Sequence, residues 1–250
     1  MEETGSGGQA GLKCWDLTLA TPEENLACDE VLLGLCDEAT GGEALRFWEP
    51  TGYFVVLGYA NRLTTEVNAP FCRANGIPIL RRCSGGGTVL QGPGCLNYAL
   101  VLRSDESGPL HSLTAANRFI LERHRAVFAS LLGAPVEMKG QTDLALGGLK
   151  FSGNAQRRKR RALLFHGSFL LDFDFGLMER ALPMPSRQPD YRAHRAHADF
   201  LMNLRLPGEK IKEALRQAWH ADGPLGALPA ELIRRLAREK YASSGWNERF

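Results

Sequence analysis

The sequence lacks long apolar runs, closely spaced cysteine pairs and a strong excess of charge of one sign. Without a run long enough to span a bilayer, a membrane protein is not indicated. The six cysteines are scattered and form no CxxC pair, so neither a zinc site nor a disulfide framework is expected, and the thiols should be reduced. The formal net charge of +2 is too balanced to indicate a nucleic-acid-binding protein.

The composition indicates one globular domain. Hydrophobic residues make up 44% and charged residues 23% of the 250 positions, which allows a well-buried core in a chain of single-domain length. Residues 1–11 are polar and glycine-rich, and they lack the basic start and apolar centre of a signal peptide. We therefore expect a disordered tail over 1–11, one domain over 12–250, and a cytoplasmic protein.

Helix and strand patterns predict an α+β fold. Thr21, Pro22 and Glu24 form a helix start signal with a capping box. Helical spacing of apolar residues predicts helices near 22–36, 65–74, 112–132, 209–220 and 230–240. Short strands are predicted near 12–20, 43–48, 54–58, 77–80, 88–90, 95–102, 135–138, 143–146, 149–152 and 163–172. Helices at both ends around many strands favour mixed β-sheets packed with helices over an alternating βαβ chain.

A glycine-rich stretch at residues 81–88 is the first candidate functional segment. Arg81 and Arg82 precede three consecutive glycines at 85–87. Such glycines are costly in chain entropy unless the backbone bends sharply or a ligand approaches closely. Bare backbone N–H groups after two arginines can bind an anion. The stretch is neither a Walker A loop nor a GxGxxG fingerprint, and taken alone a plain tight connection would explain it as well.

A second candidate segment covers residues 148–156 and contains Lys150 followed by Ser, Gly and Asn. A lysine in a strand can simply point to solvent, because side chains alternate between the two faces. Further on, His166 and Ser168 are two residues apart in a predicted strand and therefore share a face. A ligand-binding role becomes the better interpretation when these segments are taken together.

Together these segments resemble the lipoate–protein ligase A family, within the biotin/lipoate ligase superfamily. The family pattern is an Arg-Arg-x-Ser/Thr-Gly-Gly-Gly loop, a Gly-Arg-Asn-Asp-Leu segment, a Lys-x-Ser-Gly-Ser/Asn-Ala motif and a His-Gly-Thr/Ser motif. In this chain the four motifs stand at residues 81–87, 140–144, 150–155 and 166–168. The resemblance covers about residues 12–250 and implies a biotin/lipoate ligase-like catalytic domain in a single-domain form.

The resemblance implies an ATP-dependent ligase. In such enzymes lipoate, or a related medium-chain acid, attacks ATP to give an acyl-adenylate, and a lysine of a lipoyl domain then displaces AMP. Arg82 and the N–H groups of residues 85–87 would offset the repulsion between the two anions, and magnesium would carry further charge. Lys150 would polarise the adenylate as an electrostatic catalyst. The implied acceptors are the acyltransferase subunits of 2-oxoacid dehydrogenases and the glycine-cleavage H protein.

The resemblance also implies the substrate-binding residues. Trp48 and Val89 would line the acyl slot, and Asp143 is the candidate magnesium ligand. The full implied set of substrate- and adenylate-binding residues is Trp48, Arg82, Ser84, Gly85, Gly86, Gly87, Thr88, Val89, Asp143, Ala155, His166 and Ser168.

Three departures from the family pattern bear on these expectations. The chain has Gln91-Gly92 where many members have His-Asp, and Gln141-Thr142 where many have Arg-Asn. It also stops at Phe250, where two-domain ligases continue with an accessory domain. A separate accessory-domain chain, or catalysis of half the reaction, is therefore an open alternative.

Two rival functions remain open. An ATP-independent octanoyltransferase of the same superfamily would use a cysteine thioester, but the stretch 136–146, where one such branch carries its cysteine, has none. Cys83, in the glycine stretch, could be activated by the arginines, although its position is variable in the family, and Cys95 is expected to be a strand residue. The second rival is a lipoyl-binding protein without turnover.

Two basic segments are explained as surface segments that face solvent or the acceptor. The run at 157–161 is Arg-Arg-Lys-Arg-Arg. Such a run is usually a solvated loop, and here it could attract an acidic acceptor domain. Nucleic-acid binding is less favoured because no aromatic residue is interleaved. His194 and His197 are three residues apart and lack a third metal ligand nearby. They are predicted to belong to a basic surface segment that faces solvent or the acceptor.

Overall fold

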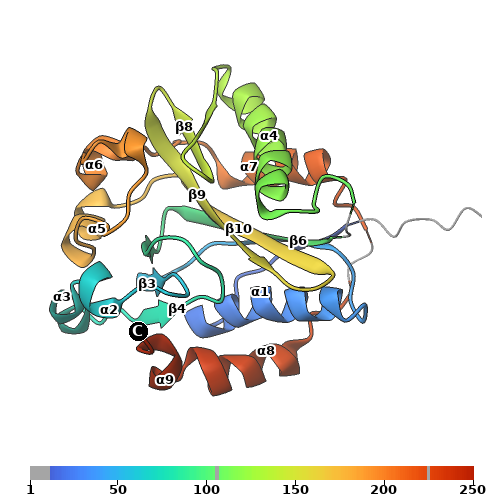
Figure 1. Cartoon of the computed structure of the whole chain (residues 1–250), viewed down its shortest axis with the longest axis horizontal. Helices are drawn as coiled ribbons and strands as arrows, with labels where there is room; N and C mark the ends of the chain where they lie inside the picture. The colour runs from blue at the N-terminus through green and yellow to red at the C-terminus, as the bar shows by residue number, and fades with distance from the viewer. Residues whose placement is uncertain (1–11, 105–106, 224–225) are drawn as a thin grey trace, which may run out of the picture.

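The computed structural model describes residues 12–104, 107–223 and 226–250, so the predicted tail over 1–11 lies outside the described residues. Two β-sheets form the framework (Figure 1). The large sheet has the order β1 (Lys13–Asp16), β2 (Ala44–Trp48), β6 (Cys95–Arg103), β10 (Ala162–Leu170), β9 (Leu149–Arg158), β8 (Asp143–Leu146) and β7 (Glu137–Lys139). The small sheet has the order β4 (Ile79–Arg81), β3 (Phe54–Leu57) and β5 (Val89–Gln91).

Parallel and antiparallel neighbours occur in both sheets. In the large sheet β1 and β2 are parallel and the other pairs are antiparallel. In the small sheet β3 is parallel to β4 and antiparallel to β5. The predicted α+β class with mixed sheets is therefore confirmed.

The long helices lie close to their predicted ranges. They are α1 (Pro22–Asp37), α4 (Leu113–Leu132), α7 (Gly208–Trp219) and α8 (Ala230–Leu236), which continues into the π-helical turn η2 (Ala237–Tyr241). The Thr21 hydroxyl accepts a hydrogen bond from the N–H of Glu24 and so caps α1. Ser112 caps α4 in the same way, and Gly133 ends it in the left-handed region at a φ of +60°.

The short helices are α2 (Leu63–Glu66), α3 (Ala69–Ala74), α5 (Phe175–Ala181), η1 (Asp190–Arg192), α6 (His197–Phe200) and α9 (Ser244–Asn247). The single helix predicted near 65–74 is wrong, because it is two helices. Asn68 accepts a hydrogen bond from the N–H of Phe71 and starts α3 anew, with Pro70 in its first turn. None of the helices in the described residues is long and apolar enough to cross a membrane.

The large sheet separates two apolar layers. Along β6, Leu96, Tyr98 and Leu100 pack on one side with α4 and α7, while Ala99 and Val101 pack on the other side with α1 and α8. In Figure 1, α4 and α7 lie above the sheet, and α1, α8 and the small sheet lie below it. The small sheet thus faces the lower side of the large one, and a ligand site can form between the two.

Two features of the strands affect the site. β2 and β3 follow each other in sequence but lie in different sheets, so the turn between them carries the chain from one sheet to the other. β9 continues to Arg158, well beyond the predicted end at Ser152. The Ser-Gly-Asn-Ala motif is therefore strand and not loop, because its backbone pairs with β10 over seven positions.

Candidate active site

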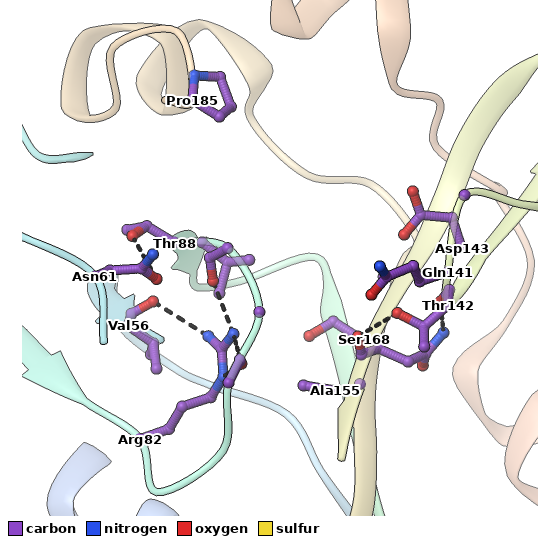
Figure 2. A pocket seen from close by; sticks show the side chains of 18 of the residues that line it. Val56, Asn61, Arg82, Thr88, Gln141, Thr142, Asp143, Ala155, Ser168 and Pro185 are labelled. Carbon is purple, nitrogen blue, oxygen red and sulfur yellow. Dashed lines mark hydrogen bonds between the residues drawn. The ribbon is translucent and has the colours of Figure 1, made fainter. Parts of the chain in front are cut away.

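A cavity of about 1720 Å³ lies between the glycine stretch, strands β9 and β10, and the segment that joins α5 to α6. Figure 2 shows Arg82 and Thr88 on one side of it and Asp143, Thr142, Ala155 and Ser168 on the other. The cavity brings together nearly all of the predicted site residues: Trp48, Arg82, Gly85, Gly86, Gly87, Thr88, Val89, Asp143, Lys150, Ala155, His166 and Ser168. Ser84 is the exception, because it is fully buried behind the cavity wall.

Lys150 reaches the cavity because β9 contains a register irregularity. The pairing of β8 with β9 shifts between Leu144 and Ala145, and Phe151 is left without a partner. A β-bulge of this kind re-aims the side chains beyond it. In an unbroken strand Lys150 and Gly153 would lie on opposite faces, yet a Cβ on Gly153 would come within 2.7 Å of Lys150 Nζ. The bulge therefore buries Phe151 in the core and places Lys150 at the cavity.

Asp143 and Tyr191 hold the lysine amine in place. Lys150 Nζ lies 2.8 Å from Asp143 Oδ1, and the Tyr191 hydroxyl donates to Asp143 Oδ2 at 2.8 Å. Burial and the adjacent carboxylate raise the pKa of Tyr191, so the phenol stays a neutral donor. The sequence did not identify Tyr191 as a site residue, because it lies in the short helix η1, far from Asp143 in sequence, and only the fold brings the two together.

The described residues do not form a metal site by themselves. Within residues 12–104, 107–223 and 226–250, no group of three or more His, Cys, Asp or Glu side chains could hold a metal ion. Both oxygens of Asp143 are already bonded to Lys150 and Tyr191. Magnesium commonly joins one or two carboxylates to substrate phosphates. We therefore derive no step through a protein-bound ion, and magnesium binding by Asp143 stays a prediction.

Arg82 shapes the glycine loop. Its guanidinium donates to the carbonyl oxygens of Gly85 at 2.6 Å and Gly87 at 2.7 Å, and burial lowers its pKa to about 10. Gly86 has a φ of +88°, and a Cβ there would lie 2.9 Å from Arg82 Nη2. Only glycine fits this turn without strain. Arg82 therefore holds the loop, and anion binding by the loop's N–H groups stays a prediction.

Arg81 turns away from the cavity, unlike Arg82. It is fully buried and donates to the carbonyl oxygens of Gly58, Tyr59, Asn61, Trp246 and Asn247. Adjacent residues of a strand point to opposite sides. One arginine therefore joins the turn after β3 to the C-terminal helix α9, and the other holds the glycine loop.

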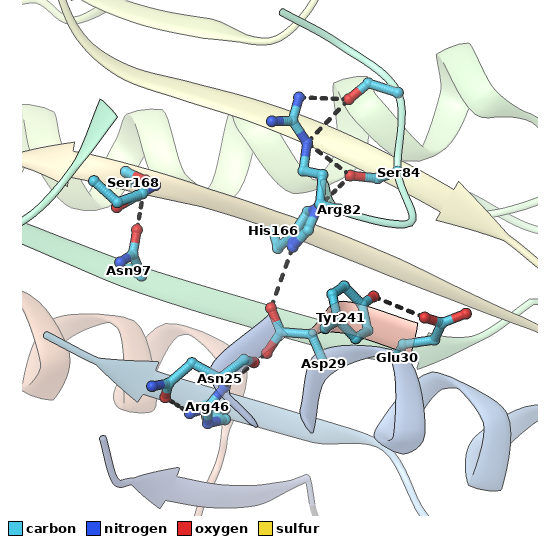
Figure 3. A network of polar contacts seen from close by, with 12 residues as sticks. Asn25, Asp29, Glu30, Arg46, Arg82, Ser84, Asn97, His166, Ser168 and Tyr241 are labelled. Carbon is cyan, nitrogen blue, oxygen red and sulfur yellow. Dashed lines mark hydrogen bonds and ion pairs between the residues drawn. The ribbon is translucent and has the colours of Figure 1, made fainter. Parts of the chain in front are cut away.

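A buried polar chain connects the glycine loop to α1 (Figure 3). Ser84 Oγ lies 2.6 Å from His166 Nε2, and His166 Nδ1 lies 3.2 Å from Asp29 Oδ2. Arg46 Nη1 donates to Asp29 Oδ1 at 2.9 Å. The spacing resembles a nucleophilic triad, but Ser84 is fully buried and does not line the cavity. The chain instead fixes the position of the loop.

Sequence reasoning missed Asp29 and Arg46, although signals existed. Asn25 and Asp29 lie four residues apart in α1, on the same face as Leu32 and Leu33, and polar residues on a buried helix face need partners. Arg46 interrupts an otherwise apolar buried strand. Both features predict a buried ion pair, but not which ligand loop it supports.

Burial deactivates the thiols near the site. Burial raises the pKa of Cys83 to about 12 and that of Cys95 to about 12. Cys83 packs in the core with Leu80 and Val56, and Cys95 lines the cavity from β6. Neither provides a thiolate near neutral pH, since the thiolate is the reactive form.

The basic surface predicted around His194 and His197 is wrong for His197. His197 is only 8% exposed and begins α6, and burial lowers its pKa. His194 has a φ of +57°, which breaks any helix between the two histidines. The chain reverses there, so the two side chains do not share a helical face.

Fold and site together define an α+β catalytic domain in which a glycine loop and a lysine converge on one cavity. The chain belongs to the lipoyl protein ligase A/B catalytic domain family, whose model matches residues 21–218.

The relatives include both ligases and transferases. The chain is 32% identical over 247 residues to a putative lipoate-protein ligase A of Aeropyrum pernix, covering 92% of this chain and 89% of that protein. It is 28% identical over 264 residues to octanoyltransferase LipM of Exiguobacterium sibiricum, covering 90% of this chain and 94% of that protein. The chain spans 61% and 60% of the length of two further curated lipoate ligases that it matches. Family membership alone therefore does not separate the two reactions.

Solved structures support the fold. A bi-partite lipoate protein ligase from Thermoplasma acidophilum, described together with its E2 lipoyl domain as an archaeal lipoylation system, superposes with a TM-score of 0.80 at 22% identity, covering 95% of this chain and 96% of that one. A lipoate-protein ligase A bound with ATP also gives a TM-score of 0.80, at 23% identity, covering 95% of this chain and 98% of that one. The predicted lipoate ligase-like fold is thus confirmed.

Proposed function

We propose that the protein activates lipoate, or a related medium-chain acid, with ATP and ligates it to a lysine of lipoyl domains. The observation that carries the proposal is the placement of Lys150. The bulge in β9 aims its amine into the cavity, and the glycine loop reaches β9 where Gly86 approaches Ala155. A cation and an anion-binding loop thus lie along the same strand, which suits a reaction between two anions.

The proposed reaction assigns each group a role in two steps. Backbone N–H groups of the glycine loop bind phosphate oxygens, and Lys150, oriented by Asp143, stabilises the charge that develops between the acyl carboxylate and the α-phosphorus. Pyrophosphate leaves, and the amine of the acceptor lysine then attacks the acyl carbon and expels AMP. Lys150 forms no covalent bond. Magnesium would enter with ATP.

The substrates are proposed from two kinds of support. The solved ligase with ATP has the same fold, as does a Thermoplasma acidophilum protein described with bound lipoic acid. The cavity has an apolar side, with Leu26, Val56 and Leu90, that suits an acyl chain. Lipoyl domains are the proposed acceptors because the bi-partite ligase is described together with its E2 lipoyl domain, and a separate accessory chain remains part of the proposal.

Octanoyl transfer is the second candidate function. The LipM octanoyltransferase matches this chain over nearly its whole length, whereas two ligase relatives extend well beyond it. Against transfer, the pKa values of Cys83 and Cys95 are raised to about 12, and a thioester route needs an accessible thiolate.

Pyrophosphate release separates the two functions. Purified protein with lipoate and Mg-ATP should release pyrophosphate, because adenylation requires no acceptor. Transfer from octanoyl carrier protein to a lipoyl domain without ATP, together with no lipoate-dependent pyrophosphate, would instead establish the transferase.

Part of the basic run is proposed to dock the acceptor. Arg158 donates to the carbonyl oxygen of Leu110, and Arg161 to that of Asp37, so both have structural contacts. Lys159 and Arg160, at the tip of the β9–β10 hairpin, are exposed. Attraction to an acidic domain by exposed charges acts mainly on encounter and is screened by salt.

Neutralising the hairpin tip tests the docking role. Replacing Lys159 and Arg160 by Gln should raise the KM for the acceptor about fivefold at low salt and leave pyrophosphate release unchanged. Arg125, exposed on α4, provides the control as Arg125→Gln. Docking at the hairpin would be contradicted if the tip variant lost pyrophosphate release as much as acceptor use. It would also be contradicted if Arg125→Gln raised the KM for the acceptor equally.

A further inference from the structure

A row of three residues crosses the large sheet beside Lys150. Tyr98 on β6 pairs with Gly167 on β10, and Gly167 pairs with Asn154 on β9. Directly opposite residues of neighbouring strands point to the same face of a sheet. Because Gly167 has no side chain, the Tyr98 hydroxyl reaches across β10 and donates to Asn154 Oδ1 at 2.6 Å. A Cβ on Gly167 would collide with that oxygen, so the glycine is what lets the row form.

Asn154 uses both ends of its amide. Tyr98 is 1% exposed, and a buried hydroxyl needs a hydrogen-bond partner, which the amide oxygen provides. The amide nitrogen donates instead to the carbonyl oxygen of Thr142 at 2.7 Å. Thr142 Oγ1 in turn donates to the carbonyl oxygen of Asn154 at 2.6 Å. A reciprocal pair of side-chain-to-backbone hydrogen bonds therefore joins Thr142 to Asn154.

This reciprocal pair lies next to the ion pair of the site. Thr142 stands in the turn directly before Asp143, the first residue of β8, and Figure 2 shows the two residues together at the cavity. Asp143 pairs with Gly153 on β9, so the reciprocal pair continues the connection between the strands one residue beyond the start of β8. It fixes the peptide that leads into Asp143, and Asp143 Oδ1 lies 2.8 Å from Lys150 Nζ.

We propose that Thr142 and Asn154 are positioning residues, which act through Asp143 to hold the Lys150 amine in its reactive position. Asn154 follows the lysine by four residues on β9, so the strand that presents the amine also anchors the turn that carries its counterion. A displacement of about 1 Å lowers the rate of a preorganised site by about 100-fold. The inference rests on the proposed function, because it concerns the same lysine.

Substitutions of Thr142 test the anchor with little change in shape. Thr142→Val replaces the hydroxyl by a methyl group and should lower the kcat of lipoate-dependent pyrophosphate release about tenfold, with the KM values for lipoate and ATP unchanged. Thr142→Ser keeps the hydroxyl and should recover most of the rate. Thr18 provides a matched control, because its hydroxyl donates to the carbonyl oxygen of Glu49 at 3.2 Å, outside the cavity lining. Thr18→Val should leave kcat unchanged.

A double variant separates positioning from a purely structural role of Asn154. Asn154→Ala removes the anchor and leaves the Tyr98 hydroxyl without its partner, so kcat and the melting temperature should both fall. Adding Tyr98→Phe removes the unpaired hydroxyl and should raise the melting temperature again by about 2–4 °C. The kcat of the double variant should stay as low as that of Asn154→Ala, because the Thr142 carbonyl remains unanchored. Recovery of kcat together with stability would reduce Asn154 to a partner of Tyr98 and overturn the proposal.

The Thr142 variants decide the proposal even if Asn154→Ala does not fold. The proposal is overturned if Thr142→Val keeps the wild-type kcat or raises KM alone. It is also overturned if Thr142→Ser is as slow as Thr142→Val, or if Thr18→Val loses as much activity.

Failure of the proposed function has a different signature, which the wild-type protein shows. Octanoyl transfer without ATP, together with no lipoate-dependent pyrophosphate release, would refute the ligase. The same variants are then compared in the transfer assay, where the same loss of kcat supports the positioning role and an unchanged kcat overturns it. A wild-type protein that is inactive in both assays would refute both proposals.

Discussion

Replacing Lys150 by methionine separates catalysis from folding. The change keeps the length of the side chain and removes its charge. Loss of one preorganised donor at a charge-developing centre lowers a rate by roughly 100- to 1,000-fold. The ion pair with Asp143 is partly exposed, with side-chain exposures of 25% and 11%, so solvent screening limits its contribution to about 1 kcal/mol. In a chain of this size that corresponds to a melting temperature lower by about 2–4 °C.

Two measurements on the same variant test this reasoning. Lipoate-dependent pyrophosphate release should fall by at least about 100-fold, while thermal unfolding stays cooperative. Lys139 offers a control, because it lies on the edge strand β7, two strands from β9, and pairs with Glu137 at 2.7 Å in an exposed setting. Lys139→Met should retain full activity. Pyrophosphate release by Lys150→Met at close to the wild-type rate would refute the role of the lysine.

Three further predictions follow from the contacts. Tyr191→Phe keeps the ring contact with Phe200 and removes the hydrogen bond to Asp143. It should lower the kcat of adenylation about fivefold and leave the KM for lipoate unchanged. A change in KM alone would contradict the role of Tyr191 in positioning Asp143 and Lys150. Cys83→Ala should transfer acyl groups at the wild-type rate, because burial raises the thiol pKa to about 12, and abolished transfer would favour a thioester route. Burial lowers the pKa of His124 from 6.5 to about 3. Between these two pH values the unfolded chain binds a proton at this histidine and the folded chain does not. The free energy of unfolding should therefore decrease as the pH falls below 6.5, with a contribution from His124 of at most about 1.4 kcal/mol per pH unit. Urea unfolding near pH 7 and pH 5 should show this slope in the wild type and a flatter one in His124→Gln.

The fold was predictable where local signals determine structure. Thr21, Ser112 and Gly133 mark helix ends through their own backbone and side-chain chemistry, and the helix start predicted at Thr21 is confirmed. The end of β9 was not predictable, because pairing with β10 extends it past the glycine of its own motif, and tertiary pairing overrides a local preference. The two helices within 65–74 required recognition of Asn68 as a second cap.

The residues that line the cavity were predictable as a set, but their geometry was not. Motifs placed Lys150 and Asp143 in the same set, yet their contact depends on the bulge at Phe151, which no local signal in the sequence marks. Tyr191 reaches Asp143 from 48 residues away. The sequence assigned a site role to Arg82 alone, but it did not predict that strand alternation sends Arg81 to α9 and Arg82 to the loop carbonyl groups. Such pairings depend on tertiary structure that sequence spacing does not encode.

The most direct test of the proposed ligase is the intact mass of a purified lipoyl domain after incubation with this protein and lipoate, with and without Mg-ATP. The proposal predicts a mass increase of one lipoyl group that requires ATP and disappears with Lys150→Met. A lipoyl domain that stays unmodified with ATP, but gains an octanoyl group from octanoyl carrier protein without it, would contradict the ligase and identify a transferase.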